Sequence, residues 1–191
     1  MKVFVSLLLI SFLLACRQNP ADDKTETNAK DTISFFQVGD YIQAEINEVN
    51  RTPYFIYKIE KQDGKLDSTA INNEVFNQLS KAFLQTDIND PSLKANYDEN
   101  VFHDQTTKSY TLNYTTTNKA LPVQSVDVLL NEDAQTVKRI FIRKLYDYGD
   151  SSVIEQLSWK PRQRFQVNRL TRHEDATESE KELIVVWNNK E

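Results

Sequence analysis

Glycine and histidine are scarce in this chain of 191 residues, which contains three glycines and two histidines. Gly39, Gly64 and Gly149 lie 25 and 85 positions apart. The phosphate-binding loops of nucleotide-binding proteins and the nucleophile elbow of α/β hydrolases need clustered glycines, because the backbone there turns sharply or approaches a ligand closely. The sequence therefore excludes these classes of enzyme.

The histidines and the acidic pairs offer little for catalysis or metal binding. His103 and His173 lie in polar stretches that we expect to connect elements, and neither has a partner at metal-ligand spacing. Neighbouring acids such as Asp98 and Glu99 are expected at solvated turns. A hydrolase would need one histidine buried beside a carboxylate in a cleft. We expect no catalytic residue, no cofactor site and no metal site, and hence no enzyme.

Cysteine occurs once, at Cys16, so the chain cannot form an internal disulfide. Exported proteins enter an oxidising compartment, where a single free thiol is a liability unless it is modified. Lys2 and an apolar run over residues 3–14, interrupted only by Ser6 and Ser11, precede this cysteine. A permanent membrane helix needs about 20 apolar residues, whereas a run of about a dozen is typical of a signal peptide.

The run ends in Leu13-Leu14-Ala15-Cys16, which resembles a lipobox, the site at which bacterial lipoprotein precursors are lipidated and cleaved. The resemblance implies that residues 1–15 are removed and that the sulfur of Cys16 receives a diacylglyceryl group. Two or three acyl chains anchor a protein firmly, since each buried methylene contributes about 0.8 kcal/mol. An ordinary signal peptide or an uncleaved anchor would instead make Cys16 incidental.

The residues after Cys16 indicate which membrane holds the protein. In familiar Gram-negative sorting, an aspartate at the next position retains a lipoprotein in the inner membrane, so Arg17 favours the outer membrane. Asp22 and Asp23 are similar to the acidic export signals of some Bacteroidota lipoproteins that face outward. We expect a lipid-anchored protein of the cell envelope, located in the outer membrane and resembling small Bacteroidota envelope lipoproteins. The sequence leaves open whether the anchor lies in the periplasmic or the surface-facing leaflet.

Beyond the signal peptide, the chain divides into a tether and a domain. Residues 16–33 contain Pro20, seven charged residues and no aromatic residue. Such a segment cannot bury enough apolar surface to offset the entropy lost on ordering, so we expect a lipidated cysteine followed by a flexible tether. Residues 34–191 have the length of a single domain, and their aromatic residues can fill a core.

Helical periodicity occurs in two segments. In the first, Phe35, Val38, Ile42, Ile46 and Val49 fall on one face of a helix. The second predicted helix spans Glu74–Leu84, with Asn72 or Asn73 as its cap and Val75 or Phe76, Leu79 and Phe83 on its buried stripe.

Elsewhere, and mostly after residue 110, apolar residues alternate with period two, which is typical of strands. The predicted strands lie around Phe55–Ile59, Tyr110–Tyr114, Val126–Leu130, Ile140–Tyr146, Val153–Trp159, Phe165–Val167 and Leu183–Trp187. Short turns between successive strands indicate antiparallel pairing. The predicted fold is α+β, with one or two helices packed on a meandering antiparallel sheet of about six to eight strands.

Basic residues concentrate between residues 137 and 172, where nine of them accompany three acidic residues. This segment carries a net charge of +6, and because the whole chain carries −5, the rest carries −11. The even spacing of Arg139 and Arg143, and of Arg162 and Arg164, places each pair on one face of a strand. Such a face can bind an anionic partner, although basic residues also occupy solvated faces and guard sheet edges.

We therefore expect a non-enzymatic, membrane-anchored binding module for an envelope protein or an anionic envelope polymer, and no nucleic-acid partner, because the net charge is negative. The alternative is a carrier of an apolar ligand or lipid in a curved antiparallel sheet. Its cavity would be lined by aromatic residues, namely Tyr110, Phe141, Tyr146, Trp159 and Phe165. A filled core would favour the binding module, and a large cavity lined by these rings would favour the carrier.

The lipobox resemblance predicts the effect of Cys16→Ser in a Gram-negative host. The variant lacks the thiol that accepts the diacylglyceryl group, so it should incorporate no radiolabelled palmitate and keep residues 1–15. Labelling and intact-mass measurement of the purified protein check both expectations. Palmitate incorporation equal to that of the unaltered chain would show that Cys16 is not the lipidated residue.

Overall fold

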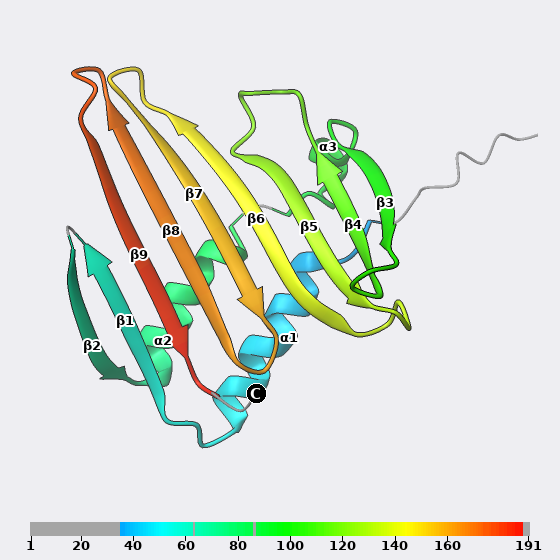
Figure 1. Ribbon diagram of the computed structural model, residues 1–191, viewed down its shortest axis with the longest axis horizontal. Coiled ribbons are helices and arrows are strands. Elements are labelled where there is room, and N and C mark those ends of the chain that lie inside the picture. Colours follow the sequence, from blue (N-terminus) through cyan, green and yellow to red (C-terminus); the bar gives the residue numbers. More distant parts are fainter. Residues whose placement is uncertain (1–34, 63, 86, 189–191) are drawn as a thin grey trace, which may run out of the picture. The chain divides into compact units, whose positions relative to one another are not determined.

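The computed structural model describes residues 35–62, 64–85 and 87–188. Within them, nine strands form one sheet in the order β2-β1-β9-β8-β7-β6-β5-β4-β3 (Figure 1), and each neighbouring pair is antiparallel. The strands are β1 (Ile56–Gln62), β2 (Lys65–Ile71), β3 (Asp98–Asp104), β4 (Ser109–Thr115), β5 (Val123–Asn131), β6 (Val137–Asp147), β7 (Ser151–Lys160), β8 (Arg164–His173) and β9 (Glu178–Val186). β3 to β9 form a meander, and the β1–β2 hairpin joins it at β9.

The α+β class and the antiparallel meander agree with the sequence-based prediction, but the sheet has more strands than the expected six to eight. The two strands that the sequence analysis did not predict, β2 and β3, are the two edges of the sheet. Nearly every residue of both strands is exposed or half-buried. An edge strand with little buried surface needs no apolar alternation, so it leaves no period-two pattern to recognise.

Four helical segments accompany the sheet: α1 (Val38–Arg51), α2 (Asn73–Ser80), η1 (Lys81–Phe83) and α3 (Pro91–Lys94). α1 and α2 lie against one face of the sheet, and the upper ends of β6 to β9 extend past them (Figure 1). α1 buries the predicted stripe of Val38, Ile42, Ile46 and Val49. Asp90 caps the short helix α3, and Pro91 is the first residue of this helix.

The second predicted helix is confirmed, with a change of geometry near its end. The Asn72 side chain accepts a hydrogen bond from the backbone N–H of Val75 at 3.0 Å, which satisfies a donor that the first turn leaves open. Phe76 and Phe83 are buried as expected, but Phe83 belongs to the 3-10 turn η1 and not to α2. None of the described helices is long and apolar enough to cross a membrane.

An aromatic cluster forms the centre of the core between α2, η1 and the sheet. Trp159 and Phe165 are cross-strand partners on β7 and β8, and both are fully buried. The Phe83 ring lies 5.1 Å from Trp159 and 5.3 Å from Phe165 between ring centroids, and Phe76 and Trp187 complete the cluster. Edge-to-face contacts of this kind add to the free energy gained by burying the rings.

Two details of the core differ from expectation or add to it. Phe55, predicted to lie in a strand, precedes β1 and is 74% exposed, whereas Ile56 points into the core.

At the other end of the sheet, the Tyr114 hydroxyl on β4 accepts a hydrogen bond from the backbone N–H of Phe36 at 2.9 Å. Burial raises the pKa of Tyr114 to about 12. This contact holds the residues before α1 against β4.

The aromatic cluster predicts a large effect of Trp159→Ala on stability. Removing a buried indole leaves a cavity and loses apolar burial, so the free energy of unfolding should fall by about 3–5 kcal/mol. Urea unfolding followed by fluorescence and circular dichroism measures this change. Phe102→Ala is the control, because Phe102 is 63% exposed on edge strand β3, and it should change stability by about 0.5 kcal/mol or less.

Candidate functional site

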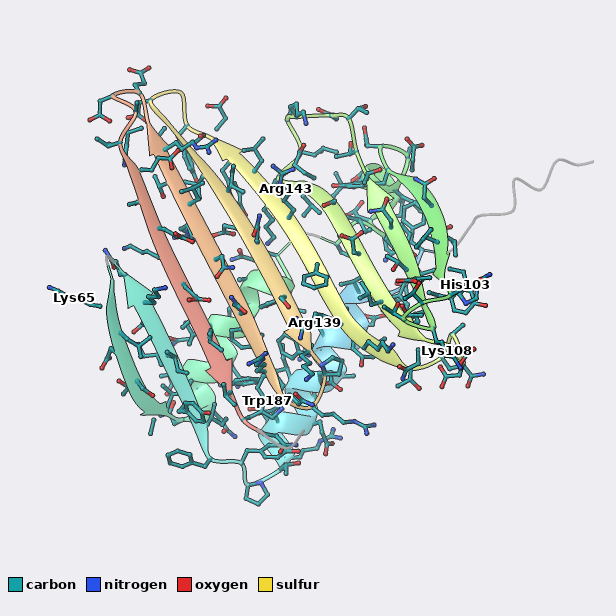
Figure 2. The ribbon with its side chains drawn as sticks, viewed as in Figure 1. Lys65, His103, Lys108, Arg139, Arg143 and Trp187 are labelled. Carbon is teal, nitrogen blue, oxygen red and sulfur yellow. The ribbon has the colours of Figure 1, made fainter. Side chains whose placement is uncertain are left out.

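The face of the sheet turned away from α1 and α2, called the open face below, carries Arg139, Phe141 and Arg143 on β6. These three residues alternate with buried Ile140 and Ile142, which face the helices. Figure 2 labels Arg139 and Arg143, which lie along the same strand. The Arg139 guanidinium lies 5.6 Å from the centroid of the Phe141 ring, close enough for a cation–π contact.

Two shallow hollows adjoin on this open face, and Arg143 borders both. One, of about 330 Å³, lies beside Phe141 and Asp127. The other, of about 360 Å³, lies beside Asn168 and Leu170 and is also bordered by Glu178 and Glu180. Gln156, the cross-strand partner of Arg143, also borders both hollows. The centre of the open face thus combines an arginine, side-chain amides and one aromatic ring with the carboxylates of Asp127, Glu178 and Glu180.

The structure places three of the four arginines proposed for an anionic partner on the open face. Arg164 lies there with Arg139 and Arg143, and within the described part of the chain none of the three forms an ion pair with an acidic side chain. The prediction for Arg162 was wrong. It lies in the turn between β7 and β8 with φ 58°, and its backbone N–H donates to Glu45 of α1 at 2.7 Å.

Acidic side chains limit the basic part of the open face. Arg172 pairs with Glu178 at 2.6 Å, and β9 also directs Glu180 and Glu182 to this side. Asp127 on β5 accepts a hydrogen bond from Asn113 at 2.6 Å. The segment excess of +6 therefore does not form one continuous strip, because alternation along each strand sends half of its basic side chains to the other side of the sheet.

A row of charged residues that the sequence analysis did not single out crosses the helix-facing side. Lys144, Glu155, Arg169 and Lys181 are successive cross-strand partners on β6, β7, β8 and β9. Glu155 is 5% exposed, and it accepts hydrogen bonds from both Nε and Nη2 of Arg169. Three cations therefore accompany one carboxylate along this row.

Lys144 is the most buried member of the row, at 1% exposed. Its Nζ donates to the backbone carbonyl of Ala82 in η1 at 2.6 Å, which links the sheet to the helical layer. Burial lowers the pKa of Lys144, and the nearby Glu155 carboxylate partly opposes this effect. The sequence could have indicated that these two charged residues are buried, because Lys144 and Glu155 occupy inward positions of two correctly predicted strands.

A hollow of about 350 Å³ lies next to this row, where η1 ends and the sheet continues. Glu155 and Arg169 border it on one side, and Tyr146 and Tyr148 border it on another. The two tyrosine rings are stacked, with centroids 6.3 Å apart and planes inclined by 13°. The hollow therefore combines charged groups with a flat aromatic wall.

The remaining candidates lie apart from these sites. His103 and His173 belong to β3 and β8 and not to connecting segments as predicted, and both are exposed. The His103 ring stacks on Tyr110 with centroids 4.3 Å apart. Asp98 and Glu99 begin β3, so their placement at a turn was also wrong. The described residues contain no cluster of three or more histidine, cysteine or acidic side chains suited to holding a metal ion.

Comparison with known proteins adds no family or fold assignment. No protein-family model, curated protein or solved structure significantly matches this chain. The assignment of a function therefore rests on the residues and surfaces described above.

The burial of Lys144 predicts a pH dependence of stability. Lysine in the unfolded chain keeps its ordinary pKa near 10.5, whereas burial lowers the pKa in the folded protein. Between the two values the unfolded state binds more protons, so the free energy of unfolding should rise with pH, and this gain is lost as the pH falls. Urea unfolding of the unaltered protein and of Lys144→Met at pH 7, 8.5 and 10 measures it.

Relative to Lys144→Met, the unaltered protein should become more stable as the pH rises to 10. Lys138→Met is the matched control, because Lys138 lies on the same strand but is exposed. A constant stability difference between the unaltered protein and Lys144→Met across the three pH values would contradict the prediction.

Proposed function

We propose that the protein is a non-enzymatic, lipid-anchored binding module of the cell envelope, and that the centre of its open face binds an anionic polymer. The observation that carries this proposal is the group of three arginines, Arg139, Arg143 and Arg164, that have no acidic partner among the described residues. Charges left unpaired on a surface attract a partner of opposite sign without first having to break an internal ion pair.

The chemistry around Arg143 supports an acidic glycan as the polymer. Guanidinium groups bind carboxylates and sulfates through paired hydrogen bonds. Gln156 and Asn168 offer amide groups that can bind hydroxyls, and the half-exposed Phe141 ring offers a flat apolar surface for a sugar ring. The shallow hollows suit a chain lying across the strands better than a small molecule that must be enclosed.

The packing of the core favours this proposal over a carrier of an apolar molecule. Trp159 and Phe165, expected to line a carrier's cavity, are fully buried against Phe83 and one another. Their rings have no free surface to offer a ligand unless the helical layer moves away. Phe141 lies on the opposite side of the sheet, so the expected aromatic lining is not continuous.

A protein partner is the second candidate, and edge strand β3 favours it. β3 pairs only with β4, so its other edge has no neighbouring strand in the described sheet. Val101 and Phe102 on this strand are more than 60% exposed. An extended segment of a partner protein could add to this edge through backbone hydrogen bonds.

The proposed anchor would keep either partner close to the membrane. Cys16 and the predicted tether, residues 16–33, lie outside the residues that the structure describes. A flexible chain of about 17 residues would have a reach of roughly 20–25 Å. The proposed outer-membrane location places the open face among the acidic polymers of the envelope. This part of the proposal rests on the lipobox resemblance.

The open-face site predicts weaker polymer binding by Arg143→Gln. The probes are polygalacturonate and dextran sulfate, and binding to the mature chain with Cys16→Ser is measured by biolayer interferometry at low salt. Losing one charge-assisted contact of about 1 kcal/mol should lower the affinity about fivefold. Arg139→Gln combined with Arg143→Gln should lower it further, and added salt should weaken binding of the unaltered protein.

Arg162→Gln is the matched control, since it removes the same charge from a turn beside α1. It should bind both polymers as the unaltered protein does. Equal losses in Arg162→Gln and Arg143→Gln would show that net charge alone governs binding. Failure of the unaltered protein to bind either polymer would refute the proposed ligand class.

A further inference from the structure

We propose that the hollow bordered by η1, β6, β7 and β8 on the helix-facing side is a second binding site, which takes a small anion with a flat apolar group. This site lies on the opposite side of the sheet from Arg139 and Arg143. The inference is therefore independent of the proposed polymer site. It rests on the charges at one wall of the hollow, the rings at another, and its size.

The charged wall has an excess of donors suited to an anion. Arg169 carries five N–H groups, and two of its nitrogen atoms donate to one oxygen of Glu155. Its side chain is still 54% exposed, so the remaining N–H groups are accessible at the hollow. Lys181 follows Arg169 in the cross-strand row and forms no ion pair with a described residue, which adds a second positive charge nearby.

The same arrangement argues against a cationic ligand. Glu155 is the carboxylate that borders the hollow, and Arg169 already occupies one of its oxygens. An incoming cation would meet the positive charges of Lys144 and Arg169 on either side of this carboxylate. An incoming anion would instead be attracted by both, and it would compete with Glu155 for the donors of Arg169.

The second wall supplies apolar surface. Tyr146 and Tyr148 present stacked rings, and Val153 and Ala82 lie at the same hollow. Tyr148 is 65% exposed, so its ring surface is accessible to a ligand at the hollow. A planar ligand can lie against this pair of rings while its anionic group reaches Arg169.

The volume and position of the hollow fit a ligand of modest size. About 350 Å³ is at the lower end of the range for small-molecule sites. The hollow exists because η1 ends at Phe83 while β6, β7 and β8 continue, so the helical layer covers only part of this side of the sheet. The hydrogen bond from Lys144 to Ala82 holds η1 at its inner margin.

Isothermal titration calorimetry with 2-naphthalenesulfonate tests the site, on the mature chain with Cys16→Ser. The uncharged 2-naphthalenemethanol is the matched ligand. We expect the unaltered protein to bind the sulfonate at least tenfold more tightly than the alcohol. Arg169→Gln should weaken sulfonate binding about tenfold, and Tyr148→Ala should weaken it several-fold. Because Tyr148 is exposed, its removal leaves the core intact.

Glu155→Gln separates an anion site from a cation site. Neutralising Glu155 releases Arg169 for the ligand, so sulfonate affinity should rise, provided that urea unfolding shows the variant to be folded. Loss of affinity in folded Glu155→Gln, or unchanged affinity in Arg169→Gln, would overturn the proposal. Undetectable sulfonate binding by the unaltered protein would also overturn it.

Arg172→Gln and Arg143→Gln are the controls for position. Arg172 lies on the same strand as Arg169 but on the open face, where it pairs with Glu178. Both variants should bind the sulfonate as the unaltered protein does. Conversely, Tyr148→Ala should bind polygalacturonate normally, because Tyr148 borders only the hollow on the helix-facing side. Failure of one proposed site is therefore distinguishable from failure of the other.

Discussion

The structure depends on the burial of Trp159 and Phe165 beneath Phe83 and the neighbouring rings of α2 and the C-terminal segment. Fully buried aromatic side chains remove large apolar areas from water and so contribute strongly to the stability of a core. This cluster packs α2 and η1 onto one side of the sheet. Among the described elements, no helix covers the opposite side or the upper ends of β6 to β9 (Figure 1). Residues of these two regions border the hollows of the candidate sites.

Lys144 lies on the helix-facing side of the sheet, at the boundary between the packed core and the part that the helices do not cover. A buried ammonium group is costly unless it finds partners, and here Ala82 accepts its hydrogen bond while Glu155 lies across the strand. Glu155 in turn binds Arg169, whose side chain reaches solvent. The row therefore passes from the core to the surface. Burying the Lys144 charge costs stability at one end, and the Arg169 charge is accessible to a ligand at the other.

Much of the fold was readable from local patterns. The period of the apolar residues predicted α1 with its buried stripe and seven of the strands, because those elements bury one side and expose the other. β2 and β3 were not predicted because edge strands bury little apolar surface and so show no alternation of apolar residues. Arg162 was misplaced for a different reason. Even spacing implies a shared face only within one strand, and Arg162 lies in the turn before β8 with a left-handed backbone conformation.

The sequence by itself determined the antiparallel α+β character, the lipobox-like segment around Cys16 and the absence of glycine-rich catalytic loops. These properties depend on the order and spacing of neighbouring residues. Only the tertiary structure decided which arginines share the open face and which charges form the row on the helix-facing side. Cross-strand pairing sets those neighbours, and it joins residues such as Glu155 and Arg169 that lie 14 positions apart. The extent of the helical layer, set by packing on the aromatic cluster, then decided which parts of the sheet remain open to a partner.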